Sequence, residues 1–293
     1  MKKTEGLVIK TYNSFYYIKI PQETNLIPCK LRGKFKQQRF SLLPGDNVQI
    51  IIDNNSTGTI EDILPRTSAL ARPAVANVNQ VVLVFAMCQP NYSYTLIDKM
   101  LALYAKTNLK IVICFNKSEL GSEEEQLALQ KIYGSIGYSL IFCSAQNKTG
   151  LNNLTACLDQ NISVFAGPSG VGKSSLLNLL QYNVNLITGA VSDKIGRGKH
   201  TTRYSELLSL DSGGYIVDTP GFSSVETRMF QDDNISDLFI EIKKLAKNCR
   251  FSSCNHNNEP DCAVKYALET GNLSLTRYES YLQLYTEVKQ LRK

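Results

Sequence analysis

A glycine-rich segment at residues 167–174, Gly-Pro-Ser-Gly-Val-Gly-Lys-Ser, has the spacing of a phosphate-binding loop. An apolar stretch precedes it and a stretch of helical pattern follows, which is the strand–loop–helix context that such a loop requires. Glycines let backbone N–H groups turn toward phosphate oxygens, and the start of the helix adds a positive dipole end. A chance glycine-rich turn is the alternative. The residues that we expect to hold a nucleotide here are Gly167, Pro168, Ser169, Gly170, Val171, Gly172, Lys173, Ser174 and Ser175, with Lys173 on the β- and γ-phosphates and Ser174 on Mg²⁺.

An aspartate ends a second apolar stretch downstream of this loop. Asp218 follows Tyr-Ile-Val and opens the sequence Asp-Thr-Pro-Gly, which ends at Gly221. A carboxylate at a strand end suits the Mg²⁺ side of a P-loop nucleotidase, and the N–H of Gly221 would lie where it can sense the γ-phosphate. Alone, this segment could be a plain turn. Because it follows a phosphate loop in the chain, the role on the Mg²⁺ side of a nucleotide site is favoured over a plain turn.

The segment between these two motifs reads Gly-Arg-Gly-Lys-His-Thr-Thr and ends at Thr202. Either Thr201 or Thr202 could complete the Mg²⁺ shell and respond to loss of the γ-phosphate, unless the segment is only a flexible basic loop. Ras-like enzymes orient the attacking water with a glutamine after Asp-x-x-Gly, but Phe222 occupies that position and cannot hydrogen-bond. We therefore expect slow intrinsic hydrolysis. His200 is our candidate for positioning the water as a catalytic residue together with Lys173, the alternative being an RNA contact or no role.

A motif that could read a guanine base lies upstream of the phosphate loop. Asn116, Lys117 and Glu119 follow an apolar stretch in the order Asn-Lys-Ser-Glu, and a carboxylate there could accept from two N–H groups of guanine, which adenine does not offer. Glu119 is one methylene longer than the usual aspartate, so the sequence leaves guanine selectivity open. Ser144 and Ala145 would support the edge of the base. Ordinary GTPases carry their phosphate loop first, so this order predicts a circularly permuted chain.

Four potential metal ligands gather near the C-terminus in the pattern Cys249-x₄-Cys254-x-His256-x₅-Cys262. Three thiolates and one imidazole predict a closed, tetrahedral zinc site of the structural type, although four such residues could also gather by accident. His256 is one of only two histidines in the chain, which favours ligation. We expect the other cysteines to be buried as small hydrophobic residues: Cys29, Cys88, Cys114, Cys143 and Cys157.

The elements that must position these residues fall into three segments of an α/β protein. Residues 1–65 contain short runs of β-branched and aromatic residues separated by turns, which predicts a small β-barrel, with the oligonucleotide-binding (OB) barrel as one possibility. Residues 66–230 alternate apolar stretches with helical patterns, which predicts a parallel sheet with helices on both faces. Residues 231–293 are predicted to be helical, with amphipathic spacing at 235–247 and 275–291.

Composition narrows the class of protein. The chain has 293 residues, of which 43% are hydrophobic, so two or three packed domains are expected and disorder of the whole chain is excluded. Its apolar runs are too short to cross a bilayer and its N-terminus lacks a secretory pattern, so we expect a cytoplasmic protein with reduced thiols and no membrane partner. The net charge is +6. Two clusters without acids favour a polyanionic partner such as nucleic acid over a merely solvated face: Lys30, Arg32, Lys34, Lys36 and Arg39, and Lys194, Arg197, Lys199 and Arg203.

Together these residues resemble the circularly permuted, ribosome small-subunit-dependent GTPase A family, and the resemblance covers essentially the whole chain. It includes the basic N-terminal barrel, the entry segment from Arg72 to Val78, the permuted motif order and the cysteine cluster. The resemblance implies a ribosome biogenesis GTPase that binds GTP and GDP with Mg²⁺ and one structural Zn²⁺. It further implies a partner, the 30S subunit with its 16S rRNA, on which GTP is hydrolysed faster late in maturation, and release after hydrolysis. We expect a monomer. Glu119 and Asn79 depart from the family, which more often has aspartate at both positions.

Two other functions remain open from the residues. A P-loop ATPase or kinase would be favoured if Glu119 fails to read guanine. An RNA-binding protein built on the barrel and the zinc site could use nucleotide as a structural ligand only. The complete set of Lys173, Ser174 and Asp218 argues against this last alternative.

Overall fold

The structure is a computed structural model that describes residues 3–21, 23, 25–33, 41–53, 57–71, 73–188, 206–210, 213–217 and 225–292, with residues 182–188 described by their backbone. The chain divides into two compact units. The first comprises Met1–Val81, Asn152–Phe165 and Ser174–Phe222, and the second comprises Val82–Leu151, Ala166–Lys173 and Ser223–Lys293.

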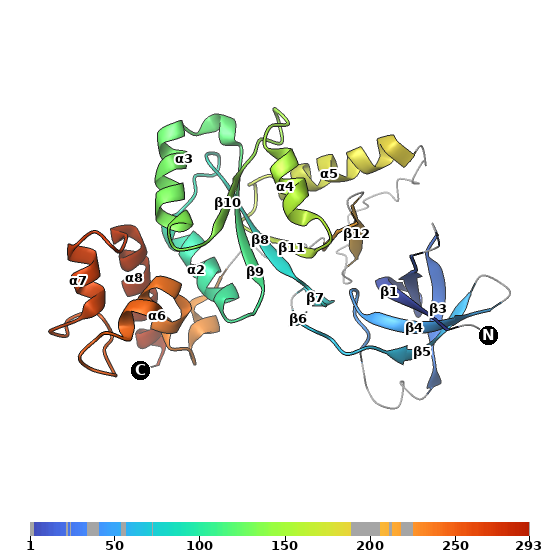
Figure 1. Ribbon diagram of the computed structural model, residues 1–293, viewed down its shortest axis with the longest axis horizontal. Helices are drawn as coiled ribbons and strands as arrows, with labels where there is room; N and C mark the ends of the chain where they lie inside the picture. Colours follow the sequence, from blue (N-terminus) through green and yellow to red (C-terminus); the bar gives the residue numbers. More distant parts are fainter. Residues whose placement is uncertain are drawn as a thin grey trace. The chain divides into compact units, whose positions relative to one another are not determined.

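The N-terminal strands form a closed barrel in the order β1-β2-β3-β5-β4 (Figure 1). This confirms the predicted barrel. Strand β3 (Ile27–Leu31) contains Pro28 and Lys30, which local strand preference does not favour. The inside of the barrel is filled by aliphatic residues such as Val8, Ile18, Val48 and Ile60, which are fully buried. The strands are β1 (Lys3–Tyr12), β2 (Phe15–Lys19), β3 (Ile27–Leu31), β4 (Asn47–Ile52) and β5 (Gly58–Ile63).

The segment that leaves the barrel packs back onto the barrel's own loop. Arg66 donates to both carboxylate oxygens of the buried Asp46, at 2.6 and 2.7 Å. Asn77 donates to the carbonyl of Gly45 at 2.7 Å. Gly45 has a φ of +90°, and a Cβ there would lie 2.1 Å from the carbonyl oxygen of Ala76, so only glycine fits. The strands β6 (Ala69–Ala71) and β7 (Ala74–Ala76) form a hairpin in this segment.

Three neighbouring strands lie in the second unit, in the order β10-β9-β8. Strands β9 and β10 pair in parallel, as predicted, and β8 is buried along its whole length. The helix α3 begins with a capping box between Ser122 and Glu125. The elements are β8 (Gln80–Ala86), α2 (Tyr94–Ala105), β9 (Lys110–Asn116), η1 (Ser118–Leu120), α3 (Glu123–Leu129), η2 (Gln130–Gly134) and β10 (Ser139–Phe142).

The first unit also contains β12, β13 and most of β11, the strand that precedes the phosphate loop in the chain. Strand β11 pairs with β13 in parallel, and β12 pairs with β13 in the antiparallel sense. At the start of β8, Gln80 donates to the hydroxyl of Ser163 on β11 at 2.8 Å. The elements are α4 (Leu151–Leu158), β11 (Ile162–Ala166), α5 (Lys173–Thr188), β12 (Leu207–Ser209) and β13 (Tyr215–Val217).

The C-terminal segment is helical, as predicted, and its last helix packs against α2 (Figure 1). The predicted helix at 235–247 is two elements, because Phe239 has an extended backbone and separates a 3₁₀ turn from α6. No helix in the described ranges is long and apolar enough to cross a membrane. The elements are η3 (Thr227–Phe230), η4 (Ile235–Leu238), α6 (Ile240–Ala246), α7 (Ala263–Glu269) and α8 (Leu275–Leu291).

Candidate functional site

The phosphate loop joins β11 to α5 through a backbone that only glycine tolerates. Gly167, Gly170 and Gly172 have φ values of +151°, +81° and +91°. A Cβ at Gly167 would lie 2.0 Å from the carbonyl oxygen of Val84 on β8, so the loop passes directly over that strand. Pro168 and Val171 complete the turn, with Val171 buried and Ser169 exposed. Gly167 therefore packs against β8, whereas residues 168–170 face solvent.

Lys173 lies at the first position of α5. Its ammonium donates to the carbonyls of Gly167 and Pro168 at 2.7 and 2.6 Å, and burial lowers its pKa below the usual value for lysine. A phosphate on this loop would meet the helix N-terminus as well as this cation. Ser174 and Ser175 follow in the first turn and are exposed.

The side chain of Asn116 connects three of the predicted motifs. It is buried at the end of β9, with 1% of its surface exposed. Its amide nitrogen donates to the carbonyl of Val171 at 2.8 Å, and its amide oxygen accepts from the backbone N–H of Ala145 at 3.0 Å. A Cβ at Gly172 would lie 2.3 Å from that amide nitrogen. The guanine motif, the base-edge loop and the phosphate loop are thus joined by one carboxamide.

Lys117 makes a second connection to the phosphate loop. It adopts a left-handed backbone, with φ of +56°, and its ammonium donates to the carbonyls of Gly170, at 3.0 Å, and Gln89. Ser144 is buried and its hydroxyl accepts from the N–H of Asn147 at 2.9 Å, which shapes the base-edge loop. Glu119 lies exposed in η1, next to this cluster in the chain.

Sequence reasoning did not single out Gln89 or the segment at 87–93 that contains it. No motif marks this segment; only the fold places the carbonyl of Gln89 beside the ammonium of Lys117. Several predicted residues lie outside the described part of the chain, so their positions stay predictions. These are His200, Thr201, Thr202, Asp218, Gly221 and Phe222, together with Arg72 and the basic residues Lys34, Lys36, Arg39, Lys194, Arg197, Lys199 and Arg203.

The predicted metal ligands converge. One ligand atom from each of Cys249, Cys254, His256 and Cys262 lies within 4.8 Å of the others. The Nδ1 atom of His256 is 3.5 Å from the sulfur of Cys249 and 3.5 Å from the sulfur of Cys262. Three sulfurs and one imidazole nitrogen at this spacing match the donor set and size of a tetrahedral zinc site. The four residues could therefore hold a metal ion.

The loop that carries these ligands is stabilised from two sides. Glu259 accepts from the N–H groups of Asn255 and Asn257 at 2.8 and 2.9 Å. Burial alone would raise its pKa, but these hydrogen bonds outweigh burial and lower the pKa to about 2. From α8, the hydroxyl of Tyr278 donates to the carbonyl of His256 at 2.7 Å. The ligand loop is thus held in place by groups outside the four ligands.

The expectation for the remaining cysteines is correct for three and wrong for two. Cys29, Cys114 and Cys143 are fully buried. Cys88 and Cys157 are half-buried, because Cys88 lies in a loop beside Asn91 and Cys157 lies near the end of α4.

Comparison with known families matches most of the chain. The family model of the RsgA N-terminal domain matches residues 5–60, and that of the RsgA GTPase matches residues 63–228. The small ribosomal subunit biogenesis GTPase RsgA of Alkaliphilus metalliredigens is 44% identical and covers 99% of this chain and 99% of its own length. The protein of the same name from Moorella thermoacetica is also 44% identical, with 97% of each chain covered.

Two solved structures resemble the chain over nearly its whole length. YjeQ from Thermotoga maritima has a TM-score of 0.81 at 35% identity, covering 98% of this chain and 99% of that one. YloQ, described as a circularly permuted GTPase, has a TM-score of 0.82 at 34% identity, covering 100% and 97%. These likenesses confirm the predicted fold class and its permuted order.

Replacing Gly172 with alanine should weaken nucleotide binding. The new Cβ would be forced against the amide of Asn116 and the positive φ would be strained, so we expect the affinity for GDP to fall roughly 10–100-fold. The measurement is isothermal titration with GDP. Gly137→Ala is the matched control, because Gly137 also has a positive φ, of +104°, but a Cβ there would meet nothing within 4 Å. Equal affinity in the two variants would contradict the role given to the close approach at Asn116.

Proposed function

The chain belongs to the RsgA GTPase family, whose members hydrolyse GTP, and from this we propose that it acts in late maturation of the 30S ribosomal subunit. The observation that carries the proposal is similarity over full length to relatives named as small ribosomal subunit biogenesis GTPases. Membership in this family favours a GTPase over the two alternatives that the motifs left open, which were an ATPase or kinase and an RNA-binding protein that does not hydrolyse nucleotide. We propose that residues 1–65 form the barrel domain, residues 66–230 the GTPase domain and residues 231–293 the zinc-binding domain.

We propose that guanine nucleotide binds at the ends of β9 and β10 and over the phosphate loop, residues 167–173, all of which lie in the second unit. Asn116 and Glu119 would read the base, with Ser144 and Ala145 at its edge. Lys117 would support the phosphate loop from beside Gly170, as its hydrogen bond to that carbonyl suggests. The exposed position of Glu119 leaves its longer side chain room to reach a base.

The phosphate end of the site would use Lys173 and the exposed backbone of the loop. Ser174, Asp218 and one of Thr201 or Thr202 are the residues that we propose for Mg²⁺. Bound there, the ion would neutralise charge that develops on the phosphate oxygens. The N–H of Gly221 would sense the γ-phosphate.

We propose that the enzyme is completed by its partner. Phe222 cannot orient water, and His200 is therefore our catalytic candidate. A polyanion that binds the basic segment around His200 would raise turnover, and loss of the γ-phosphate would then favour release. The net charge of +6 and the aromatic and basic side chains of the barrel support 16S rRNA as that polyanion, for example Lys30 over the ring of Phe15 at 5.1 Å. We propose a cytoplasmic monomer.

Steady-state GTP hydrolysis should rise roughly tenfold or more when purified 30S subunits are added. Phosphate release is measured at matched salt, since binding to rRNA weakens as salt rises. The 50S subunit is the control for a general polyanion effect. A protein that binds GTP but shows no rise specific to 30S subunits would contradict the ribosomal role while leaving the nucleotide site intact.

The variant His200→Ala should keep its affinity for GTP, and its GTP turnover in the presence of 30S subunits should fall at least tenfold. The reason is that the imidazole is proposed to position water and not to hold the nucleotide. Titration of GTP and stimulated turnover are measured on the same preparation. Arg203→Ala is the comparison for loss of a contact between this segment and rRNA. Unchanged stimulated turnover in His200→Ala would remove this residue from the mechanism.

We propose that the ion held by Cys249, Cys254, His256 and Cys262 is a structural zinc. Elemental analysis of protein purified without added metal should find about one zinc per chain. Cys249→Ser should lose that zinc and expose the C-terminal helices to proteolysis. Cys157→Ser, which removes a half-buried thiol outside the cluster, should keep it. Full zinc content in Cys249→Ser would overturn the assignment.

A further inference from the structure

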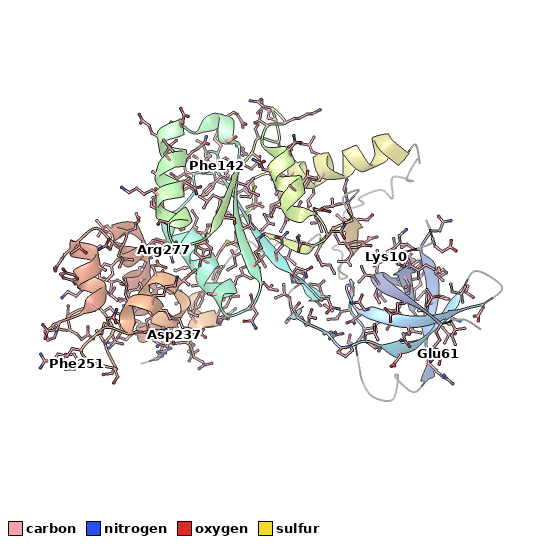
Figure 2. All side chains as sticks on the ribbon, in the orientation of Figure 1. Lys10, Glu61, Phe142, Asp237, Phe251 and Arg277 are labelled. Carbon is pink, nitrogen blue, oxygen red and sulfur yellow. The ribbon has the colours of Figure 1, made fainter. Side chains whose placement is uncertain are left out.

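An arginine on α8 lies fully buried where the C-terminal helices meet α2. Arg277 has 1% of its surface exposed, and Figure 2 labels its position. Its Nη1 donates to Asp98 on α2 at 2.6 Å, and its Nε and Nη2 donate to Glu241 on α6 at 2.7 and 3.1 Å. The ring of Phe239 lies 4.7 Å from the guanidinium carbon. Three charges from three helices are thus enclosed together.

This cluster resists separation of α8 from α2. Asp98 is also only 1% exposed, and it accepts from the hydroxyl of Tyr133 at 2.9 Å. Moving α8 away would leave the carboxylate and the guanidinium buried without each other, which is strongly unfavourable in an apolar environment. The ion pair therefore favours movement of the two helices as one piece.

Other contacts attach α2 to the same C-terminal segment along its length. Lys99 pairs with Glu287 at 2.6 Å, and Lys106 pairs with Asp233 at 2.8 Å. Near the start of α2, the hydroxyl of Thr95 donates to the side chain of Gln283 at 3.1 Å. The C-terminal segment thus contacts the beginning and middle of α2 and the residue that follows its last turn.

The segment that precedes α2 in the chain lies next to the phosphate loop. Ser93 caps the helix, and residues 87–92 come directly before it. The carbonyl of Gln89 accepts from the ammonium of Lys117, which also donates to Gly170. A Cβ at Gly170 would touch Pro90 at 3.6 Å, an ordinary packing distance. Displacement of α2 would therefore move a hydrogen-bond partner of Lys117.

We propose that Asp98 and Arg277 are positioning residues for the nucleotide site, acting through α2 and the 87–93 segment. The inference rests on the nucleotide site of the proposed function. It couples the C-terminal helices to nucleotide affinity: a shift of α8 that strains the ion pair lowers affinity. By linkage, bound nucleotide stabilises the contact between α2 and α8 to the same extent.

The test is Asp98→Asn. Asparagine keeps the size of the side chain and an oxygen for Tyr133, while Arg277 keeps Glu241, so the change weakens chiefly the connection between α2 and α8. We expect the dissociation constant for GDP to rise about fivefold or more. We also expect faster hydrogen exchange at the amides of 87–93, which a purely structural role at the distant ion pair would leave unchanged.

Lys243→Met is the matched control. It also removes a positive charge from the C-terminal helices, but Lys243 is exposed and pairs with Asp237 of the same segment and not with α2. Its GDP affinity should stay that of the parent protein even if its melting temperature falls. A folded Asp98→Asn protein with parental GDP affinity would overturn the proposal.

Lys99→Met keeps the proposal testable if Asp98→Asn does not fold. It breaks a half-buried pair between the same two helices, and a smaller rise in the dissociation constant for GDP is expected. Parental affinity in Lys99→Met would then overturn the proposal. Failure of the proposed function is distinguishable, because it would appear in the parent protein as absent stimulation by 30S subunits or absent GDP binding.

Discussion

The two hydrogen bonds of the Asn116 carboxamide hold together the loops of the proposed nucleotide site. Its donor side holds Val171 of the phosphate loop and its acceptor side holds Ala145 of the base-edge loop. A buried amide needs both of its ends satisfied, since an unpaired polar group away from water is costly. Both loops must therefore come to the end of β9. The glycine at 172 is required for the same reason, because any side chain there would collide with the amide.

This arrangement also explains why a permuted chain can build the site. Asn116 ends β9 and Ser144 follows β10, which is parallel to β9. Parallel strands bring their carboxyl ends to one edge, so the residues that follow these two strands meet there wherever the strands stand along the chain. The site depends on which strand ends are neighbours, and the position of the termini does not alter that.

Two neighbouring residues of α8 make contacts that fix the position of this helix in the C-terminal segment. Tyr278 donates from it to the carbonyl of His256 in the metal-ligand loop, and Arg277, one residue earlier, pairs with Asp98 on α2. A buried charge must be paired, and residues outside the candidate ligands must keep the ligand loop in position. Because α8 does both, it has little freedom to shift alone. Together these contacts connect the loop of the four candidate metal ligands to α2 through one helix.

The sequence by itself predicted the phosphate-loop segment, the Asn-Lys-Ser-Glu segment, the four residues that could hold a metal and the buried strands β8 and β9, because these depend on residue type and short spacing. It also determined the permuted order, since order is a property of the chain. Only the tertiary structure decided that Gln89 meets Lys117 and that Arg277 pairs with Asp98, a residue 179 positions earlier. It likewise decided that Ile27–Leu31 is a strand and that Phe239 interrupts a helix. Such features depend on partners distant in the chain, and the free energy of burying and pairing them outweighs the weak local preferences that a sequence pattern records.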